Sequence, residues 1–127
     1  MRAATFPVGF YELTEGYFTS EAEAFAEIEA MGWHAYAQDR VMTNDEELHW
    51  HDFEAVTFVV SGMLRVADEQ GVVIEAGPGT RAQTGAGYLH RELAGAPHRL
   101  VFGFPIDPSE FTMPLNKPPE LLATLKA

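Results

Sequence analysis

Near the middle of the chain, residues 47–62 read ELHWHDFEAVTFVVSG. In an extended strand, side chains two positions apart point to the same face. His49 and His51 therefore direct two imidazoles into one space, while Trp50 points the opposite way. This pattern suits the binding of one metal ion, and the alternative is a pair of surface or pocket histidines that hold nothing. The apolar stretch at residues 55–60 then predicts a buried strand.

Short segments with a two-residue period lie on both sides of this stretch, separated by turns rich in Gly, Pro, Asn and Asp. So many short strands predict a sandwich or a barrel, because a sheet closed on itself leaves no bare edge. We expect strands at about residues 33–38, 40–42, 47–51, 55–60, 63–67, 72–75, 80–84, 88–93 and 98–104.

One helix is expected before the strands. Ser20 and Glu23 have the spacing of a capping box, which predicts a helix at about residues 21–31. Residues 1–19 are rich in aromatic side chains and helix breakers, so we expect them to be irregular. The tail at residues 119–126 is expected to hold one short helix.

The composition limits the function. The chain has 127 residues, one domain of ordinary size, and its 8 basic and 19 acidic residues give a net charge of −11. This charge repels phosphate, and the basic residues are scattered, so we expect no nucleic-acid partner. The absence of cysteine leaves His, Asp and Glu to hold any metal. We expect no membrane span or signal peptide, and a cytoplasmic location.

Residues 43–94 resemble the two motifs of the cupin superfamily. The first motif reads G-x5-H-x-H-x3–4-E-x6-G, and the second reads G-x5-P-x-G-x2-H-x3-N. The matching residues are His49, His51 and Gly62 in the first motif and Gly79, Gly87 and His90 in the second.

The sequence also departs from both motifs. Thr43 stands in place of the opening glycine of the first motif, and its glutamate falls on Ala55 or Val56, neither of which can bind a metal. In the second motif, Gly85 replaces the proline and Ala94 replaces the asparagine. The ligand set implied by the resemblance is therefore short of its carboxylate.

The resemblance implies an all-β fold: a small single-domain cupin β-barrel, also called a double-stranded β-helix or jelly roll, with one N-terminal α-helix. Residues 1–127 would form one domain. The N-terminal segment and helix would occupy residues 1–32, the barrel residues 33–105 and the C-terminal tail residues 106–127.

The resemblance further implies that His49, His51 and His90 hold one divalent transition metal. Imidazole donors do not select sharply among Fe, Mn, Ni and Zn. Glu54 lies one place before the position of the motif's glutamate, and a bulge after His51 would rotate it inward. Glu54 is thus a candidate fourth ligand, and the alternative is a solvated carboxylate at the barrel mouth.

The strand faces assigned to the barrel interior predict a pocket for a small-molecule ligand. The residues expected to line it are Tyr36, Met42, Phe58, Gln83, His98, Phe102 and Phe104.

Three functions stay open on the sequence alone, because a fold does not decide function. A three-histidine site resembles those of metal-dependent dioxygenases that act on small organic acids, phenols or thiols. The second candidate is a non-catalytic sensor of a small ligand or metal, and the third is a structural barrel without a metal. The aromatic N-terminal segment and the outward Trp50 also predict a homodimer.

Overall fold

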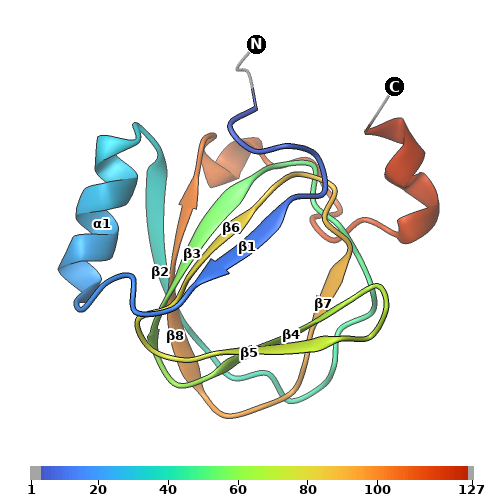
Figure 1. Cartoon of the computed structure of the whole chain (residues 1–127). Helices are drawn as coiled ribbons and strands as arrows, with labels where there is room; N and C mark the ends of the chain where they lie inside the picture. Colours follow the sequence, from blue (N-terminus) through green and yellow to red (C-terminus); the bar gives the residue numbers. More distant parts are fainter. Residues whose placement is uncertain (1–3, 126–127) are drawn as a thin grey trace.

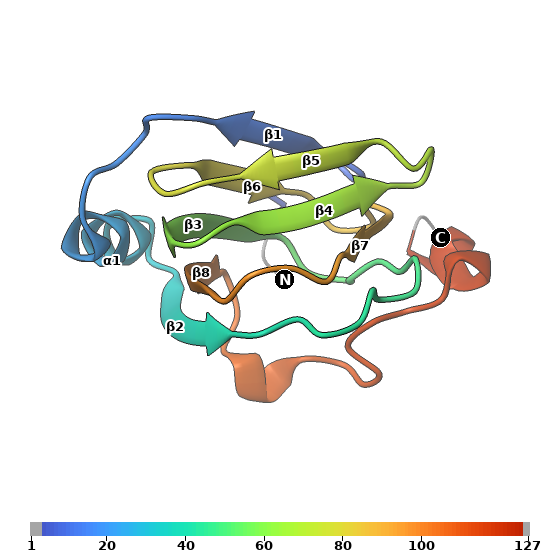
Figure 2. The same ribbon diagram turned by 90° about the horizontal axis from the view of Figure 1, so that it is seen from below.

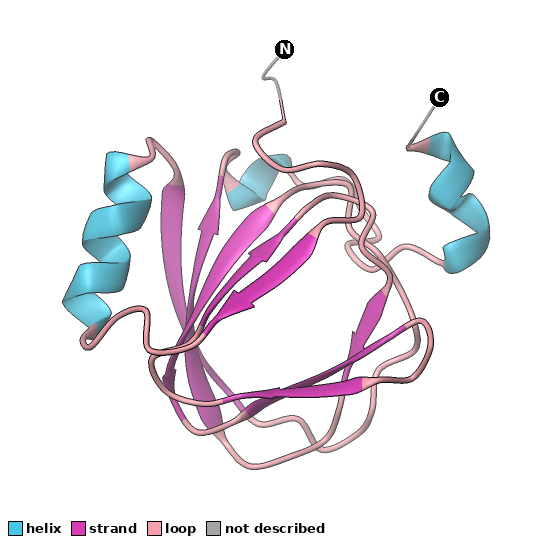
Figure 3. Cartoon of the chain, viewed as in Figure 1, coloured by secondary structure: helices cyan, strands magenta, loops and turns pink. Residues whose placement is uncertain are grey.

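Two antiparallel β-sheets face each other and enclose the interior of the molecule (Figures 1 and 3). The computed structural model describes residues 4–125. One sheet has the strand order β1-β6-β3-β8-β2 and the other the order β5-β4-β7, so the all-β expectation is confirmed. The strands are β1 (Tyr11–Thr14), β2 (His34–Arg40), β3 (Ala55–Ser61), β4 (Leu64–Asp68), β5 (Val73–Ala76), β6 (Arg81–Thr84), β7 (His90–Glu92) and β8 (His98–Phe104).

Helix α1 (Glu21–Ala30) packs on the outer face of the five-stranded sheet (Figure 2). Its start follows the expected cap, because the Ser20 side chain accepts a hydrogen bond from the Glu23 amide. Ile28 is fully buried between the helix and the sheet. In residues 4–125, no helix combines the length and the apolar character that crossing a membrane requires.

Small residues on the sheet let the helix approach. Ala35 and Ala37 of β2 pack against the cluster beneath α1. A Cβ atom added at Gly103 of β8 would lie 2.7 Å from Val56 Cγ2 and 2.8 Å from Ile28 Cγ1. Because side chains alternate between faces, the aromatic residues Tyr36 of β2 and Phe102 and Phe104 of β8 lie on the other face, inside the barrel.

The structure differs from the expected strands in three places. Residues 11–14, expected to be irregular, form β1 and pair with β6. Strand β2 continues to Arg40, so residues 40–42 do not form a strand of their own. Residues 47–51 contribute only isolated bridges at His49 and Trp50.

The C-terminal tail returns to the barrel and covers it at one end. It contains two short 3-10 helices, η1 (Pro108–Glu110) and η2 (Pro119–Thr124). The second agrees with the helix expected at residues 119–126, of which Lys126 lies outside the described residues.

Trp50 is buried by this tail of its own chain, whereas we expected it to face outward, toward a second subunit. The Trp50 indole Nε1 donates to the Pro118 carbonyl at 2.8 Å, and the Trp50 and Lys117 backbones exchange hydrogen bonds of 3.1 and 2.9 Å. Only 2% of the residue is exposed. The indole therefore anchors the tail of its own chain.

The aromatic N-terminal segment is also used within the chain. Phe6 contacts Trp33 edge to face at 6.0 Å, and Phe18 contacts Phe58 in the same way at 5.2 Å. Both observations from which we expected a homodimer are thus explained by contacts within one chain. The homodimer stays a prediction, which sedimentation at micromolar concentration would test.

Candidate metal centre

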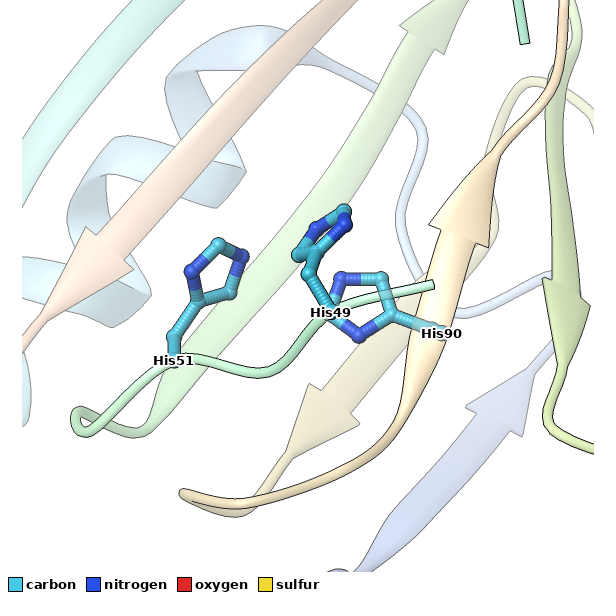
Figure 4. A group of neighbouring side chains, drawn as sticks. All are labelled: His49, His51 and His90. Atoms are coloured by element: carbon cyan, nitrogen blue, oxygen red, sulfur yellow. The ribbon is translucent and has the colours of Figure 1, made fainter. Parts of the chain in front are cut away.

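Three histidines from two distant segments converge inside the barrel (Figure 4). His49 and His51 lie between β2 and β3, and His90 begins β7. The backbones of His49 and His90 exchange two N–H···O hydrogen bonds of 2.9 Å, which aligns the two segments. The ring centroids of the three pairs are 4.5–5.2 Å apart, and the candidate ligand nitrogens all lie within 4.8 Å of one another. This spacing places all three imidazoles around one common point.

Each imidazole has its Nδ1 beside a backbone carbonyl oxygen. A carbonyl only accepts hydrogen bonds, so in the neutral ring Nδ1 carries the proton and Nε2 keeps its lone pair. Metal-binding histidines are typically oriented in this way by an acceptor on their second nitrogen. The contacts are His49 Nδ1 with Glu47 O at 2.7 Å, His51 Nδ1 with Leu115 O at 2.9 Å and His90 Nδ1 with Tyr88 O at 2.8 Å.

Burial keeps two of these rings, His51 and His90, neutral. The pKa of His90 is lowered to about 3, mainly by desolvation and to a smaller extent by the nearby His49 and His51, against the opposing effect of the Tyr88 carbonyl. Desolvation also lowers the pKa of His51 below its ordinary value. His51 and His90 are therefore unprotonated near neutral pH, as metal binding requires.

The C-terminal tail positions one of the three rings. The Leu115 carbonyl that accepts from His51 Nδ1 belongs to a loop held by Lys117. The Lys117 ammonium donates to the Thr112 carbonyl at 3.0 Å and to the Pro114 carbonyl at 2.7 Å. The orientation of His51 thus depends on contacts far away in the sequence.

Glu54 is not a ligand in this arrangement, which corrects our candidate assignment. Its carboxylate accepts hydrogen bonds from the Thr5 amide at 2.9 and 3.0 Å and from the Phe6 amide at 2.8 Å. The residue is only 6% exposed, so it is not a solvated carboxylate either. The amides of the N-terminal segment engage both carboxylate oxygens and so keep them away from the histidines.

Glu46 is a site residue that the sequence did not reveal. Its Oε1 lies 3.8 Å from His49 Nε2, the nitrogen with the free lone pair. Its position is set by β7, because the Glu46 amide donates to the Glu92 carbonyl at 2.9 Å and Glu46 Oε1 accepts from the Glu92 amide at 3.1 Å. In the first motif this position is one of the unspecified residues before His49, so no sequence signal pointed to it. The carboxylate can accept a proton or add an oxygen donor at the cluster.

A cavity of about 650 Å³ lies beside His51 and His90. The Phe53 ring stacks against His51 at 4.9 Å, and the Tyr88 ring stacks against His90 at 5.4 Å. Three of the seven residues that we expected in the pocket line this cavity: Tyr36, Phe102 and Phe104.

The other four expected pocket residues lie outside the cavity lining. Phe58 is on the opposite face of β3, in the core under α1, because this strand is buried on both faces and its apolar run hides the alternation. Gln83 lies between two cavity-lining residues of β6 and so faces away. Met42 follows the end of β2 and accepts a hydrogen bond from Arg40 through its sulfur. His98 is buried at the start of β8, with Nδ1 3.1 Å from the Ala96 carbonyl.

No profile of a known protein family matches the sequence, and neither does any curated protein. Solved structures do align with it. A DUF861 family protein from Thermotoga maritima aligns with a TM-score of 0.51 and 16% identity, over 75% of this chain and 99% of that chain. The DMSP lyase DddQ from Ruegeria pomeroyi aligns with a TM-score of 0.52 and 20% identity, over 63% and 41%. The polyketide cyclase RemF from Streptomyces resistomycificus aligns with a TM-score of 0.50 and 21% identity, over 72% and 68%.

The chain has the cupin fold. This confirms the fold that the two partial motifs predicted. At these identities the likeness concerns the fold alone, so the chemistry of this chain has to be argued from its own residues.

Without metal, this protein should lose stability as the pH falls. Because the pKa of His90 is lower in the folded than in the unfolded chain, the unfolded chain binds more protons between about pH 6.5 and about pH 3. The free energy of unfolding then falls by up to about 1.4 kcal/mol per pH unit from this group. Urea denaturation between about pH 7 and about pH 5 measures this slope, and His90→Gln should reduce it. An unchanged slope in His90→Gln would contradict the assignment.

Loosening the tail should weaken metal binding without removing a ligand. In Lys117→Met the two carbonyls lose their donor, so the Leu115 carbonyl orients His51 less well, and we expect affinity for Zn²⁺ to fall by up to about tenfold. Competition with a chelating dye measures this change. Glu110→Gln is the control, because Glu110 is an exposed residue of η1. Equal Zn²⁺ affinities in Lys117→Met and the wild-type chain would show that the tail does not position His51.

Proposed function

We propose that this cupin is a metal-dependent protein in which His49, His51 and His90 hold one divalent transition-metal ion beside the cavity. The observation that carries the proposal is that the three imidazoles converge, each with its Nδ1 beside a backbone carbonyl, a contact that leaves the Nε2 lone pair of the neutral ring for a metal. The convergence is what distinguishes the cluster from His98, whose Nδ1 has the same contact with the Ala96 carbonyl but which is not part of the cluster.

The donor set is suited to such an ion. Three neutral imidazoles are good ligands for iron, manganese, nickel and zinc, and they do not select among these metals. Because the imidazoles are neutral, the ion keeps its full positive charge. This charge favours a small molecule that offers an anionic oxygen as a further donor. A bound ion would supply Lewis acidity and, if redox-active, oxidation chemistry at the cavity wall.

The side chains around the cluster would do the rest of the chemistry. The Glu46 carboxylate, 3.8 Å from His49 Nε2, is placed to accept a proton from an acidic ligand. The aromatic rings of Phe53 and Tyr88 pack on His51 and His90 and shield part of each ring from water. Excluding water strengthens the electrostatic interactions of a bound anion.

For the reaction itself, we propose dioxygenation of a small organic substrate, in which both atoms of O₂ enter the product and no external reductant is needed. Imidazoles that occupy one side of an ion leave the other side open for small molecules, as in non-haem oxygenase sites. The cavity beside His51 and His90 offers room for the organic substrate.

Metal analysis tests the first part of the proposal. The chain purified without a His-tag should contain about one first-row metal ion, and His51→Ala and His90→Ala should lose it. Glu54→Gln is the matched control: it should keep the metal, because its carboxylate binds the N-terminal backbone instead. A wild-type chain that stays metal-free after incubation with Fe²⁺, Mn²⁺, Ni²⁺ and Zn²⁺ would refute a metal site.

Oxygen uptake tests the second part. The chain loaded anaerobically with Fe²⁺ should consume O₂ in the presence of at least one member of a panel of catechols, thiols, diketones and aromatic acids. Uptake should disappear in His90→Ala. Glu46→Gln should slow oxygen uptake by about tenfold or more, because the proton acceptor is lost. A metal-loaded chain that is silent with the whole panel would favour a non-catalytic ligand-binding role over dioxygenation.

A further inference from the structure

We propose that the cavity of this cupin selects a small molecule with one aromatic ring system and a single negatively charged oxygen group, of which benzoate is the simplest example. The position of the anionic group rests on the proposed metal site. The preference for an aromatic ring rests on the cavity walls, which exist with or without a metal.

Aromatic rings line the cavity next to two of the three histidines. Phe53, which stacks on His51, also stacks on Phe111 at 4.1 Å with an interplanar angle of 10°. Phe104 meets both of these rings edge to face, at 5.5 and 5.0 Å. Tyr88, which stacks on His90, stacks in turn on Tyr11 at 4.4 Å. All of these aromatic side chains line the same cavity.

This lining favours a flat ring over a saturated one. Aromatic pairs in offset or edge-to-face contact gain energy beyond the area that they bury, because the negative ring face meets a positive ring edge. The Phe53, Phe104 and Phe111 cluster contains both ring arrangements, so an incoming ring would extend contacts already present. A saturated ring of the same size would bury similar area without that gain.

The polar wall of the cavity limits the ligand to one negative charge. It contains one guanidinium and two carboxylates, and the cation is already paired, with Arg40 Nη1 2.6 Å from Glu92 Oε1. The second carboxylate, Glu46, accepts from the Glu92 amide at 3.1 Å. The wall therefore offers no free cation to a second anionic group, and its own net charge of about −1 repels one.

The cavity has room for such a ligand and an entrance for it. Its volume of about 650 Å³ lies within the range of small-molecule sites in proteins. Tyr36, which lines it, is 56% exposed, so the cavity reaches the solvent at this residue. Single-ring and fused-ring acids both fit this description.

Calorimetric titrations of the Zn²⁺-loaded chain test the inference, since zinc binds the ligand without redox turnover. The probes are benzoate, cyclohexanecarboxylate and phthalate, which differ in aromaticity or in charge. We expect benzoate to bind about threefold to tenfold more tightly than cyclohexanecarboxylate. Phthalate should bind more weakly than benzoate, and Glu46→Gln should reduce this difference.

Two matched variants separate the ring effect from general destabilisation. Phe111→Leu keeps an apolar side chain in the wall and should bring the benzoate and cyclohexanecarboxylate affinities within about twofold of each other. Phe25→Leu makes the same replacement on α1, which is outside the cavity lining, and should leave the preference unchanged.

The same titrations on the metal-free chain keep this inference distinct from the proposed function. A chain that binds no metal but still prefers benzoate would overturn the metal site and leave the ring preference standing. A chain that binds Zn²⁺ but binds cyclohexanecarboxylate as tightly as benzoate would overturn the ring preference alone. Absence of benzoate binding to both forms, or tighter binding of phthalate, would also overturn the inference.

Discussion

The hydrogen bond between each imidazole Nδ1 and a backbone carbonyl is the interaction on which the site depends. For His49 and His90 the acceptor is the carbonyl two residues earlier, so the extended backbone supplies the contact locally. His98 has the same local contact with Ala96 without joining the cluster. The contact therefore fixes a tautomer, and only the pairing of the His49 and His90 backbones turns it into a shared site.

The third ring depends on long-range structure. His51 Nδ1 finds its acceptor in the C-terminal tail, which is anchored by Trp50 and Lys117. Trp50 lies between His49 and His51 in the sequence, so one short segment sends two rings inward and uses the residue between them to attach the tail that orients one of those rings. The tail thereby completes the site.

The sequence correctly predicted the features that depend on the alternation of side chains along a strand. It gave wrong expectations where contacts with distant segments determine the structure. His49, His51 and His90 could be found because the spacing within each motif and the alternation of side chains along a strand depend only on residues close in the sequence. Phe58 was assigned to the wrong face because β3 is apolar on both sides, so its sequence shows no alternation of apolar and polar residues. Strand β1 was missed because its residues are ordinary and only pairing with β6 makes them extended.

The carboxylates show the same limit more sharply. Glu54 was the obvious candidate by position, yet the Thr5 and Phe6 amides, nearly fifty residues away in the sequence, hold its carboxylate away from the histidines. Glu46 does not occupy a specified position of either motif. Its backbone hydrogen bond to Glu92 places its carboxylate 3.8 Å from His49 Nε2. Proximity to the three histidines in the fold, and not position in a motif, decides which carboxylate can interact with them.

The helix and the cavity are two consequences of one pattern in β2 and β8. Close packing of α1 requires small residues on the outer face, which Ala35, Ala37 and Gly103 provide. Alternation then leaves Tyr36 and Phe102 for the inner face, where they line the cavity. A one-residue shift in the register of either strand would expel the helix and remove the aromatic wall together. The stability of the fold and the chemistry of the pocket are therefore tied to the same register.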